Sequence, residues 1–407
     1  TSIAASIAAA SFAVSPLLWS QAIITEVYTL NALFTGVVSL LVLHWCRGAP
    51  RSSWLLLVAG FTLGLGLGNH LTQAFLALPL AYCLALHREA LTFGLIARSL
   101  GLLLLGLGVY LYLPLRASSN PPINWGDASS LEGFIWTVSA KPYWGLAFRL
   151  PLAGLPERLV EWADLLLRQP NALGMLLGGL GVWRLRAGSA PLLVFTGLLF
   201  LSSLAYSIMY HTADAQVYLL PGLLVLFSWT GVGLYWLMGI AAKLGERRKG
   251  LAIPQIALAV AACLGIPVLN LLLNFQGTSL RDDRESLAYA QGIFQRLEPN
   301  AVIIADTERE LFPLWYYSYV VEEGRGPTVL STRLVQFDWY IQGQRERYPD
   351  IVSPNVTGAY WDRLIQLVEN NLGKRPVYIT AGASSLLSQF DGQEEDGLYR
   401  LTKRRTG

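Results

Sequence analysis

The sequence predicts an α-helical polytopic membrane protein followed by a small α/β soluble domain. The chain of 407 residues is 53% hydrophobic and only 14% charged, whereas soluble domains carry about 25% charged residues. The charges are also segregated, because long apolar runs broken by short polar segments give way near residue 273 to a normal globular composition. We therefore expect a multi-span transmembrane domain over residues 1–273 and an external soluble domain over residues 274–407.

The apolar runs set the expected number of helices. A membrane-crossing helix needs roughly 20 apolar residues, and several runs reach that length, so we expect about nine spans. The first is short, as expected for a chain that starts inside a span, and the third and fourth are separated only by a polar turn at Asn69 and His70. The expected spans cover residues 2–14, 28–45, 54–68, 72–86, 95–114, 171–183, 191–210, 217–241 and 251–273.

The loops between these helices alternate in charge. The short loops at residues 15–27, 69–71 and 211–216 contain no Lys or Arg, while the loops between them are basic. Cytoplasmic loops are enriched in Lys and Arg, so we expect a multi-pass plasma (inner) membrane protein with an external or periplasmic C-terminal domain. The basic residues are Arg47, Arg51, Arg88, Arg98, Arg184, Arg186, Lys243, Arg247, Arg248 and Lys249.

This topology collects polar residues from distant parts of the sequence on the external side. Polar and ionisable groups at membrane depth are costly and usually functional, and their convergence says more than any one of them. We therefore predict an external ligand site that faces the bilayer surface. Its candidate residues are Glu26, Asn69, His70, Arg116, Asn120, Trp125, Asp127, His211 and Asp214.

Structural roles compete with the functional one at several of these positions. Glu26 lies just before an expected helix, where an acid also favours the helix dipole. His70 follows a ladder of glycines that permits close helix packing, and a single His at a helix break is more often a hydrogen-bonded structural residue. Asp214 can cap the next helix, and its spacing of three from His211 does not identify a metal.

The external segment at residues 112–136, YLPLRASSNPPINWGDASSLEGFIW, is the most informative stretch. Arg116 ends a span where a lipid phosphate lies, and its guanidinium can bind phosphate bidentately, although interfacial arginines also snorkel without a ligand. Asn120 begins a rigid Asn-Pro-Pro run, and Trp125 and Asp127 bracket a tight turn. These features suit a carbohydrate or head-group pocket, and an interfacial loop with a purely structural role is the alternative.

Five motifs occur in the chain in a recognisable order: SPLLWSQAIITEVYTLNALF, GLGLGNHLT, YLPLRASSNPPINWGD, DAQVYLLP and FPLWY…DWYI. In these motifs the chain resembles, over nearly its whole length, a multi-pass family long catalogued as a domain of unknown function and now described as protein O-mannosyltransferase-like. The resemblance implies the GT-C glycosyltransferase architecture. It also implies transfer of a hexose, with mannose expected, from a polyprenyl-phosphate donor to a hydroxyl of an external protein acceptor.

One departure from the family limits what is carried over. The family places its catalytic acid in the first external loop, upstream of the region that residues 1–31 resemble, so we expect an N-terminally truncated copy whose base lies before Thr1. The role is not transferred to Asp127, which belongs to a later loop. Arg116 is expected to bind the donor phosphate, with His70 or His211 assisting. Glu26, Trp125 and Asp127 are expected to shape the sugar pocket.

The partners follow from the same reading. We expect a polyprenyl-phosphate-linked sugar, an external protein or glycan acceptor and the lipid bilayer. A net charge of +3, concentrated in loops, does not indicate nucleic acid. No cofactor is assigned, and a divalent metal is left open.

The C-terminal region alternates expected strands and helices, which favours a small parallel or mixed sheet. Asp306, Thr307 and Glu308 follow a buried strand, at the edge where open α/β sheets bind ligands. Acceptor recognition or a structural cap is expected there.

Two other functions stay open. One is a GT-C enzyme that acts on a glycolipid or cell-wall polymer. The other is a non-catalytic envelope protein or transporter, which should carry polar residues near the membrane midplane and broken helices in both halves. Here the polar residues gather at one face, which favours an enzyme at the membrane surface.

Overall fold

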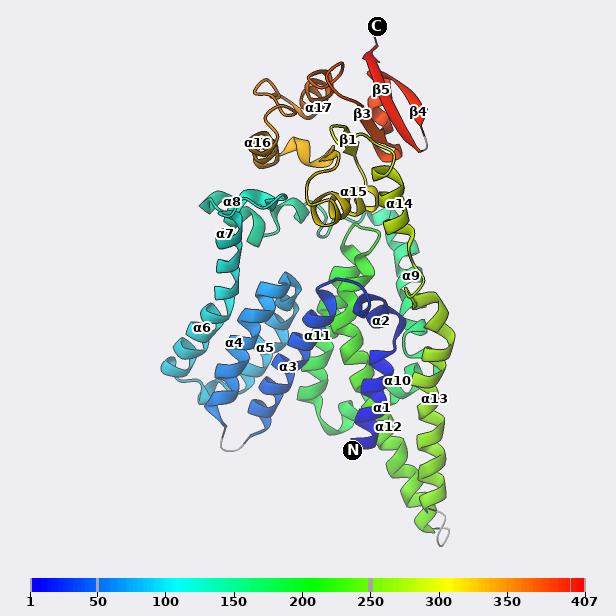
Figure 1. Ribbon diagram of the computed structural model, residues 1–407. Coiled ribbons are helices and arrows are strands. Elements are labelled where there is room, and N and C mark those ends of the chain that lie inside the picture. The colour runs from blue at the N-terminus through cyan, green and yellow to red at the C-terminus, as the bar shows by residue number, and fades with distance from the viewer. Residues whose placement is uncertain (1, 49–50, 248–251, 396, 406–407) are drawn as a thin grey trace. The chain divides into compact units, whose positions relative to one another are not determined.

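The computed structural model describes residues 2–48, 51–247, 252–395 and 397–405. Its internal packing divides the chain into two compact units (Figure 1). The helical unit comprises Thr1–Tyr110 and Pro142–Leu280, and the sheet unit comprises Leu111–Lys141 and Arg281–Gly407. The basic-loop residues Arg248 and Lys249 lie outside the described residues.

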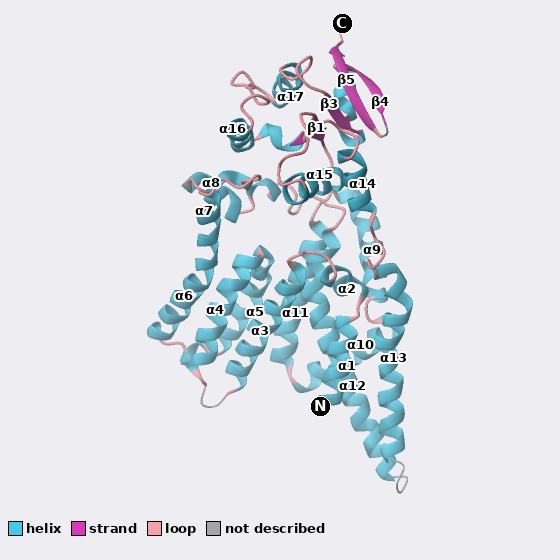
Figure 2. Ribbon diagram, in the orientation of Figure 1, coloured by secondary structure: helices cyan, strands magenta, loops and turns pink. Residues whose placement is uncertain are grey.

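The helical unit is built from helices, most of which correspond in place to the apolar runs of the sequence (Figure 2). Short 3₁₀ segments, η1 (Leu71–Leu76) and η7 (Ala215–Leu219), precede two of them. The α-helices are α1 (Ser2–Ala13), α2 (Pro16–Ala22), α3 (Tyr28–Arg47), α4 (Ser53–Asn69), α5 (Ala77–Leu86), α6 (Phe93–Leu107), α9 (Leu155–Arg168), α10 (Asn171–Gly188), α11 (Ala190–Met209), α12 (Leu220–Arg247) and α13 (Ala252–Thr278). The short α2 and the charged, amphipathic α9 were not expected.

Glycines let pairs of these helices approach closely. A Cβ added at Gly64 of α4 would lie 2.1 Å from the backbone oxygen of Leu103 in α6. A Cβ at Gly181 of α10 would lie 1.9 Å from the backbone oxygen of Trp229 in α12. Such distances are sterically forbidden, so these backbone contacts require glycine, as in other tightly packed membrane helices.

The expectation of about nine spans is not supported. Among the described residues, 4 helices are long and apolar enough to cross a membrane, or up to 5 if α1 and α2, bent by 64°, form one broken span. The apolar runs are interrupted by turns: α4 stops at His70, whose backbone is extended (φ −157°, ψ 133°), and only shorter apolar helices flank it. The spanning candidates are Tyr28–Arg47, Phe93–Ala117, Ala190–Met209 and Ala215–Lys243.

The sheet unit contains the predicted small sheet, in the strand order β2-β1-β3-β5-β4. The first three strands are parallel, with Val302 opposite both Thr328 and Val377, and β5 pairs antiparallel with β3 and β4. Every residue of β1 is buried, as expected for the central strand of a parallel group. The strands are β1 (Val302–Ala305), β2 (Thr328–Ser331), β3 (Val377–Thr380), β4 (Phe390–Glu395) and β5 (Leu398–Arg404).

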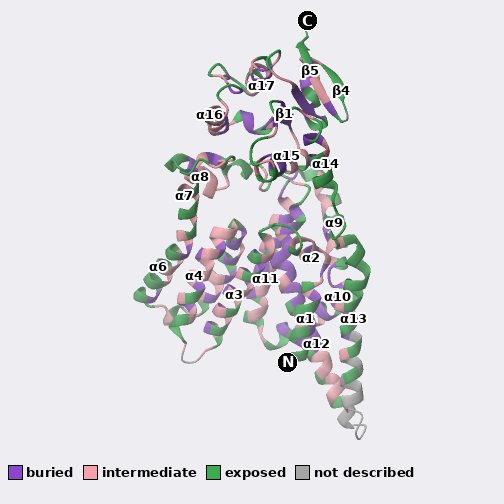
Figure 3. Cartoon of the chain, in the orientation of Figure 1, coloured by how far each residue is buried: buried purple, intermediate pink, exposed green. Residues whose placement is uncertain are grey.

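Helices surround this sheet, and the buried residues concentrate around its parallel strands (Figure 3). The segment Leu111–Lys141 packs with them: the backbone oxygen of Asn120 accepts a 2.6 Å hydrogen bond from the Arg347 guanidinium. The division of residues 1–273 and 274–407 between membrane and solvent stays a prediction. The helices are α7 (Tyr112–Ala117), α8 (Leu131–Val138), α14 (Glu285–Phe294), α15 (Glu308–Tyr316), α16 (Asp338–Arg347) and α17 (Tyr360–Glu369).

Candidate functional site

Aromatic side chains from three sequence-distant segments gather around His70 at one end of the helical unit. Tyr28 begins α3, His70 joins α4 to η1, and Tyr218 lies in η7. The His70 ring is 5.4 Å from the Tyr28 ring and 5.9 Å from the Tyr218 ring, centroid to centroid. Tyr206 and Tyr210, at the end of α11, lie 5.3 and 4.7 Å from Tyr218. We call these five residues the His–Tyr cluster.

The His70 ring is fixed by the turn that it caps. Its Nδ1 accepts a hydrogen bond from the Thr72 backbone N–H (3.2 Å) and lies 2.8 Å from the Thr72 hydroxyl. Burial lowers the pKa of His70 to about 4, so the imidazole is neutral at pH 7. Because Nδ1 accepts, the proton lies on Nε2. Within the described part of the chain no hydrogen bond of Nε2 is found, so this N–H is a donor open to a ligand.

A buried polar network supports this turn from below. Asn31 donates to the Thr72 hydroxyl (2.9 Å), and Gln73 donates to the Asn31 side-chain oxygen (2.6 Å) and to Thr35 (3.1 Å). Asn31 and Gln73 are 2% and 1% exposed. None of these residues was predicted. The available signal was that Asn31 and Thr35 lie on the same face of α3 as Tyr28, three and seven positions after it, in an otherwise apolar run.

The predicted acids border the cluster. Glu26 and Asp214 are both exposed, and both act electrostatically on the Tyr28 hydroxyl. The Asp214 side chain does not cap η7, so the capping role considered for it is not observed. Asn69 donates to the Val27 backbone oxygen (3.1 Å) and thereby ties the end of α4 to the start of α3.

His211 lies next to the cluster in sequence and its ring takes no part in it. Its backbone N–H donates to the Leu146 backbone oxygen (3.0 Å). Among the described residues, no ring contact or side-chain hydrogen bond of His211 is found.

The remaining predicted residues belong to the sheet unit. The Asp127 carboxylate accepts from Asn124 (3.0 Å) and from Ser129 (2.6 Å) and so closes its own turn. The Trp125 ring packs 5.8 Å from that of Trp339 and keeps 38% of its surface exposed. The Trp-Gly-Asp motif is therefore a turn closed by hydrogen bonds, with a partly exposed tryptophan.

Arg116 and Asn120 lie just before this turn. The Arg116 side chain is exposed in the last turn of α7, and no ion pair of its guanidinium is found among the described residues. Asn120 has a left-handed backbone (φ 47°). Whether these residues share one site with the His–Tyr cluster stays a prediction.

The carboxyl edge of the parallel strands is closed by the protein's own side chains. Glu310 accepts hydrogen bonds from Thr307 (2.8 Å), Thr380 (2.9 Å) and the Gly382 backbone N–H (3.0 Å). Asp306 accepts from the Thr332 hydroxyl and from Arg333 (3.1 Å). Of the two roles expected for this edge, the contacts favour the structural cap.

Two further features bear on the chemistry. No group of three or more His, Cys, Asp or Glu that could hold a metal ion is found in the described ranges.

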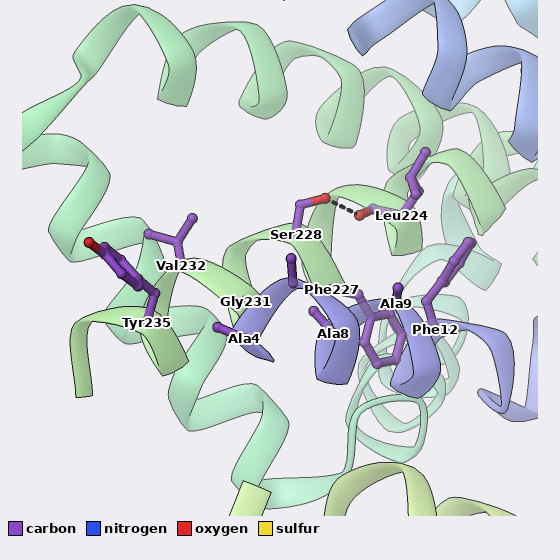
Figure 4. Close-up of a pocket in the computed structure, with 11 residues that line it drawn as sticks. Ala4, Ala8, Ala9, Phe12, Leu224, Phe227, Ser228, Gly231, Val232 and Tyr235 are labelled. Carbon is purple, nitrogen blue, oxygen red and sulfur yellow. Dashed lines mark hydrogen bonds between the residues drawn. The ribbon is translucent and has the colours of Figure 1, made fainter. Parts of the chain in front are cut away.

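A hollow of about 480 Å³ lies between α1 and α12, where Ala8 faces Gly231, and Phe12 and Tyr235 lie toward its two ends (Figure 4). Its described lining has no charged side chain, so it cannot pair with the charge of a lipid phosphate.

Comparison with known proteins returns one family throughout. Residues 1–92, which include His70 and its supporting network, match the family described as "Protein O-mannosyl-transferase TMEM260 N-terminal domain". The chain is 24% identical over 378 residues to the mouse Protein O-mannosyl-transferase TMEM260, covering 88% of this chain and 52% of the relative. It is 20% identical over 444 aligned positions to the Dictyostelium discoideum Protein O-mannosyl-transferase tmem260, covering 97% and 53%.

The chain thus spans about half the length of the curated relatives it matches. The matched N-terminal family region and the long alignments agree with the motifs from which the resemblance was predicted. That prediction is confirmed: the chain is related in sequence to the protein O-mannosyltransferase-like family.

Proposed function

We propose that this chain forms part of a membrane glycosyltransferase of the GT-C type. The enzyme transfers a hexose, with mannose as the favoured sugar, from a polyprenyl-phosphate donor to a hydroxyl of an external protein acceptor. The observation that carries the proposal is the convergence of Tyr28, His70 and Tyr218 at one end of the helices. It lies partly within the region matched by the O-mannosyl-transferase family, and both relatives are named as protein O-mannosyl-transferases.

The cluster has the chemistry of a sugar site. Sugars are neutral and carry many hydroxyls, so they are bound by neutral donors, by carboxylate acceptors and by aromatic faces. His70 offers a neutral Nε2–H, and Glu26 and Asp214 offer exposed carboxylates beside Tyr28. A neutral His70 cannot supply positive charge to a phosphate, so its role in this proposal is to donate a hydrogen bond.

Arg116 is the proposed partner of the donor phosphate. The leaving lipid phosphate carries negative charge that a fixed guanidinium stabilises, and Arg116 is exposed at the end of a candidate span. Trp125 offers a free aromatic face for a sugar ring, and Asp127 and Asn120 position it. The carboxylate base that deprotonates the acceptor is proposed to come from a part of the relatives that this chain does not cover.

The test is a transfer assay with the whole protein in membranes. Polyprenyl-phosphate mannose serves as donor, and unmodified protein segments and glycolipids serve as separate acceptors. Mannose transfer to protein is the expected result. Solute transport without sugar transfer from any polyprenyl donor would contradict the proposal that the protein is an enzyme. Transfer to glycolipid alone would contradict the proposal that the acceptor is a protein.

Two variants test the residue roles. Arg116→Ala should weaken donor use sharply, because the phosphate loses its bidentate partner. Arg98→Ala is a matched control, since Arg98 is also exposed and, among the described residues, its one hydrogen bond goes to the Gly94 backbone oxygen of its own helix. Equal donor use in both variants would contradict the phosphate assignment.

A further inference from the structure

Helix α8 of the sheet unit is apolar on two sides. Its inner side packs on the unit: the Trp136 ring lies 5.5 Å from the Phe337 ring and 6.1 Å from the Trp339 ring. Its outer side presents Leu131 and Ile135, which are 75% and 54% exposed. A helix that packs on a water-soluble domain normally turns mainly polar residues outward, whereas α8 exposes Leu131 and Ile135 beside a single acid, Glu132.

Helix α15 repeats the pattern. Leu314 and Trp315 face the core at 0% and 8% exposure. Phe312, Tyr316 and Val320 follow at intervals of four residues and are 48%, 57% and 59% exposed. One turn of π-helix continues α15 through Val320, so these three side chains form a second outward stripe.

A neighbouring helix extends this second stripe. Leu287 of α14 is 41% exposed, and together with Phe312 and Tyr316 it lines a surface hollow of about 470 Å³. We call Leu131, Ile135, Leu287, Phe312, Tyr316 and Val320 the apolar face. Clusters of exposed large apolar side chains mark surfaces that are covered by a partner or a membrane.

The apolar face lies where the chain enters the unit. Within the sheet unit, α7, α8, α14 and α15 occupy one edge, and α17, β4 and β5 occupy the opposite edge (Figure 1). Helix α7 completes the candidate span Phe93–Ala117. Helix α14 begins at Glu285, after α13 ends at Thr278, and so short a linker reaches at most roughly 25 Å.

We propose that the apolar face inserts into the interfacial layer of the lipid bilayer. One link runs through α7, which completes a candidate span, and the other comes from the shorter apolar helix at the end of α13, so the bilayer surface is the partner always within reach of this edge. Amphipathic surfaces of this kind bury their apolar side chains at the boundary between head groups and acyl chains. The linker to α14 carries Arg281, Asp282, Asp283 and Arg284, whose charges cancel, so the insertion is driven by apolar burial and does not depend on anionic lipid.

The proposal is tested by measuring contact with lipid at single positions. The full chain, with its three cysteines replaced by Ala, is reconstituted into phosphatidylcholine bilayers. One cysteine is introduced by Ile135→Cys, Leu131→Cys or Phe312→Cys and labelled with a fluorophore. Trp361→Cys is the matched control, because Trp361 is 44% exposed and lies on α17 at the opposite edge.

Brominated lipids should quench the labels at positions 131, 135 and 312 several-fold more than the label at 361, and aqueous iodide should show the reverse order. Strong iodide quenching at all four positions would place the face in water and overturn the proposal. Protection from both quenchers would mean that protein covers the face, which also overturns it. Lipid quenching that appears only with anionic bilayers contradicts insertion by apolar burial. Because no sugar is present, these results do not depend on the transferase proposal.

Discussion

His70 in the helical unit and Glu310 in the sheet unit both join structural elements, but their hydrogen bonds are used differently. Glu310 accepts from Thr307, Thr380 and Gly382, so both of its oxygens are engaged. His70 uses only Nδ1, which is held by Thr72, and leaves its Nε2–H open. The first arrangement is complete without a ligand, whereas the second is held rigidly and still has a donor to offer.

The difference separates structural polar residues from candidates for binding. Buried polar groups are costly unless they are paired, so a fully paired carboxylate at a sheet edge needs no functional explanation. A fixed, neutral donor beside two tyrosines and two exposed acids retains binding capacity. By this criterion Asp127 is intermediate, because its Oδ1 accepts from both Asn124 and Ser129 while no hydrogen bond of its Oδ2 is found among the described residues, and Arg116 belongs with His70.

Removing the open donor should have the largest effect. His70→Ala is expected to lower the mannose-transfer rate of the whole protein by roughly 10²-fold or more, the usual cost of deleting one preorganised hydrogen-bond donor. His70→Gln, whose amide can donate from a similar place, should recover part of the rate. His44→Ala is the control, because His44 is exposed and its side chain, in the part of the chain that the structure describes, contacts the Leu40 oxygen of its own helix and no other hydrogen-bond partner. If the transfer rate of His70→Ala equals that of the control variant, His70 does not take part in the site.

The low pKa of His70 predicts a loss of stability in acid. The folded state holds the His70 pKa at about 4, below the ordinary histidine value of about 6.5, so the unfolded chain binds the proton more readily between these values. This contribution to stability is complete above pH 6.5 and is lost as the pH falls through 4, by at most about 3 kcal/mol. The midpoint temperature of thermal unfolding should therefore fall more steeply for the wild type than for His70→Gln as the pH is lowered from 7 to 4. Parallel curves would show that His70 is not desolvated.

Removing the hydrogen-bonded carboxylate of Glu310 in the sheet unit should lower stability and leave the transfer rate unchanged. Glu310→Ala removes the acceptor of four side-chain and backbone donors and should lower the free energy of unfolding by roughly 2 kcal/mol. Glu308→Ala, two residues earlier and exposed, should change it by less than about 0.5 kcal/mol. Denaturant unfolding followed in the sheet unit measures both. A loss of transfer rate in folded Glu310→Ala would mean that the sheet edge binds a ligand.

Much of this contrast was readable from the sequence, and part of it was not. Loop charge and apolar runs indicated helices and the convergence of residues such as His70 and Asp214 near one end of them. The number of spans was overestimated because runs such as residues 54–68 and 72–86, counted as two spans on either side of the turn at His70, form helices that are too short to count as spans. The network of Asn31, Thr72 and Gln73 joins positions some 40 residues apart, and only tertiary packing creates it.

The sheet unit shows the same limit. The turn at Trp125 was expected from its Gly and Asp neighbours, since turn chemistry is local. That Trp125 packs on Trp339 was not foreseen, because more than 200 residues separate the two tryptophans in sequence. The alternation of strands and helices predicted the small sheet. The sequence did not tell whether the acids at its edge bind a ligand or accept hydrogen bonds from donors of the same unit.

The smallest effect is expected at Asp127, and it gives the sharpest contrast with His70. Asp127→Asn keeps an oxygen that accepts from Ser129 and Asn124, so stability should fall by only about 1 kcal/mol and the transfer rate should change less than roughly threefold. A general base at this position would instead lose roughly 10²–10⁴-fold on the same change. Glu132→Gln, an exposed neighbour in α8, sets the background for both measurements. A large loss of rate in a stably folded Asp127→Asn protein would show that a carboxylate whose Oδ1 is held in its own turn can still act on substrate, and pairing would no longer separate the two regions.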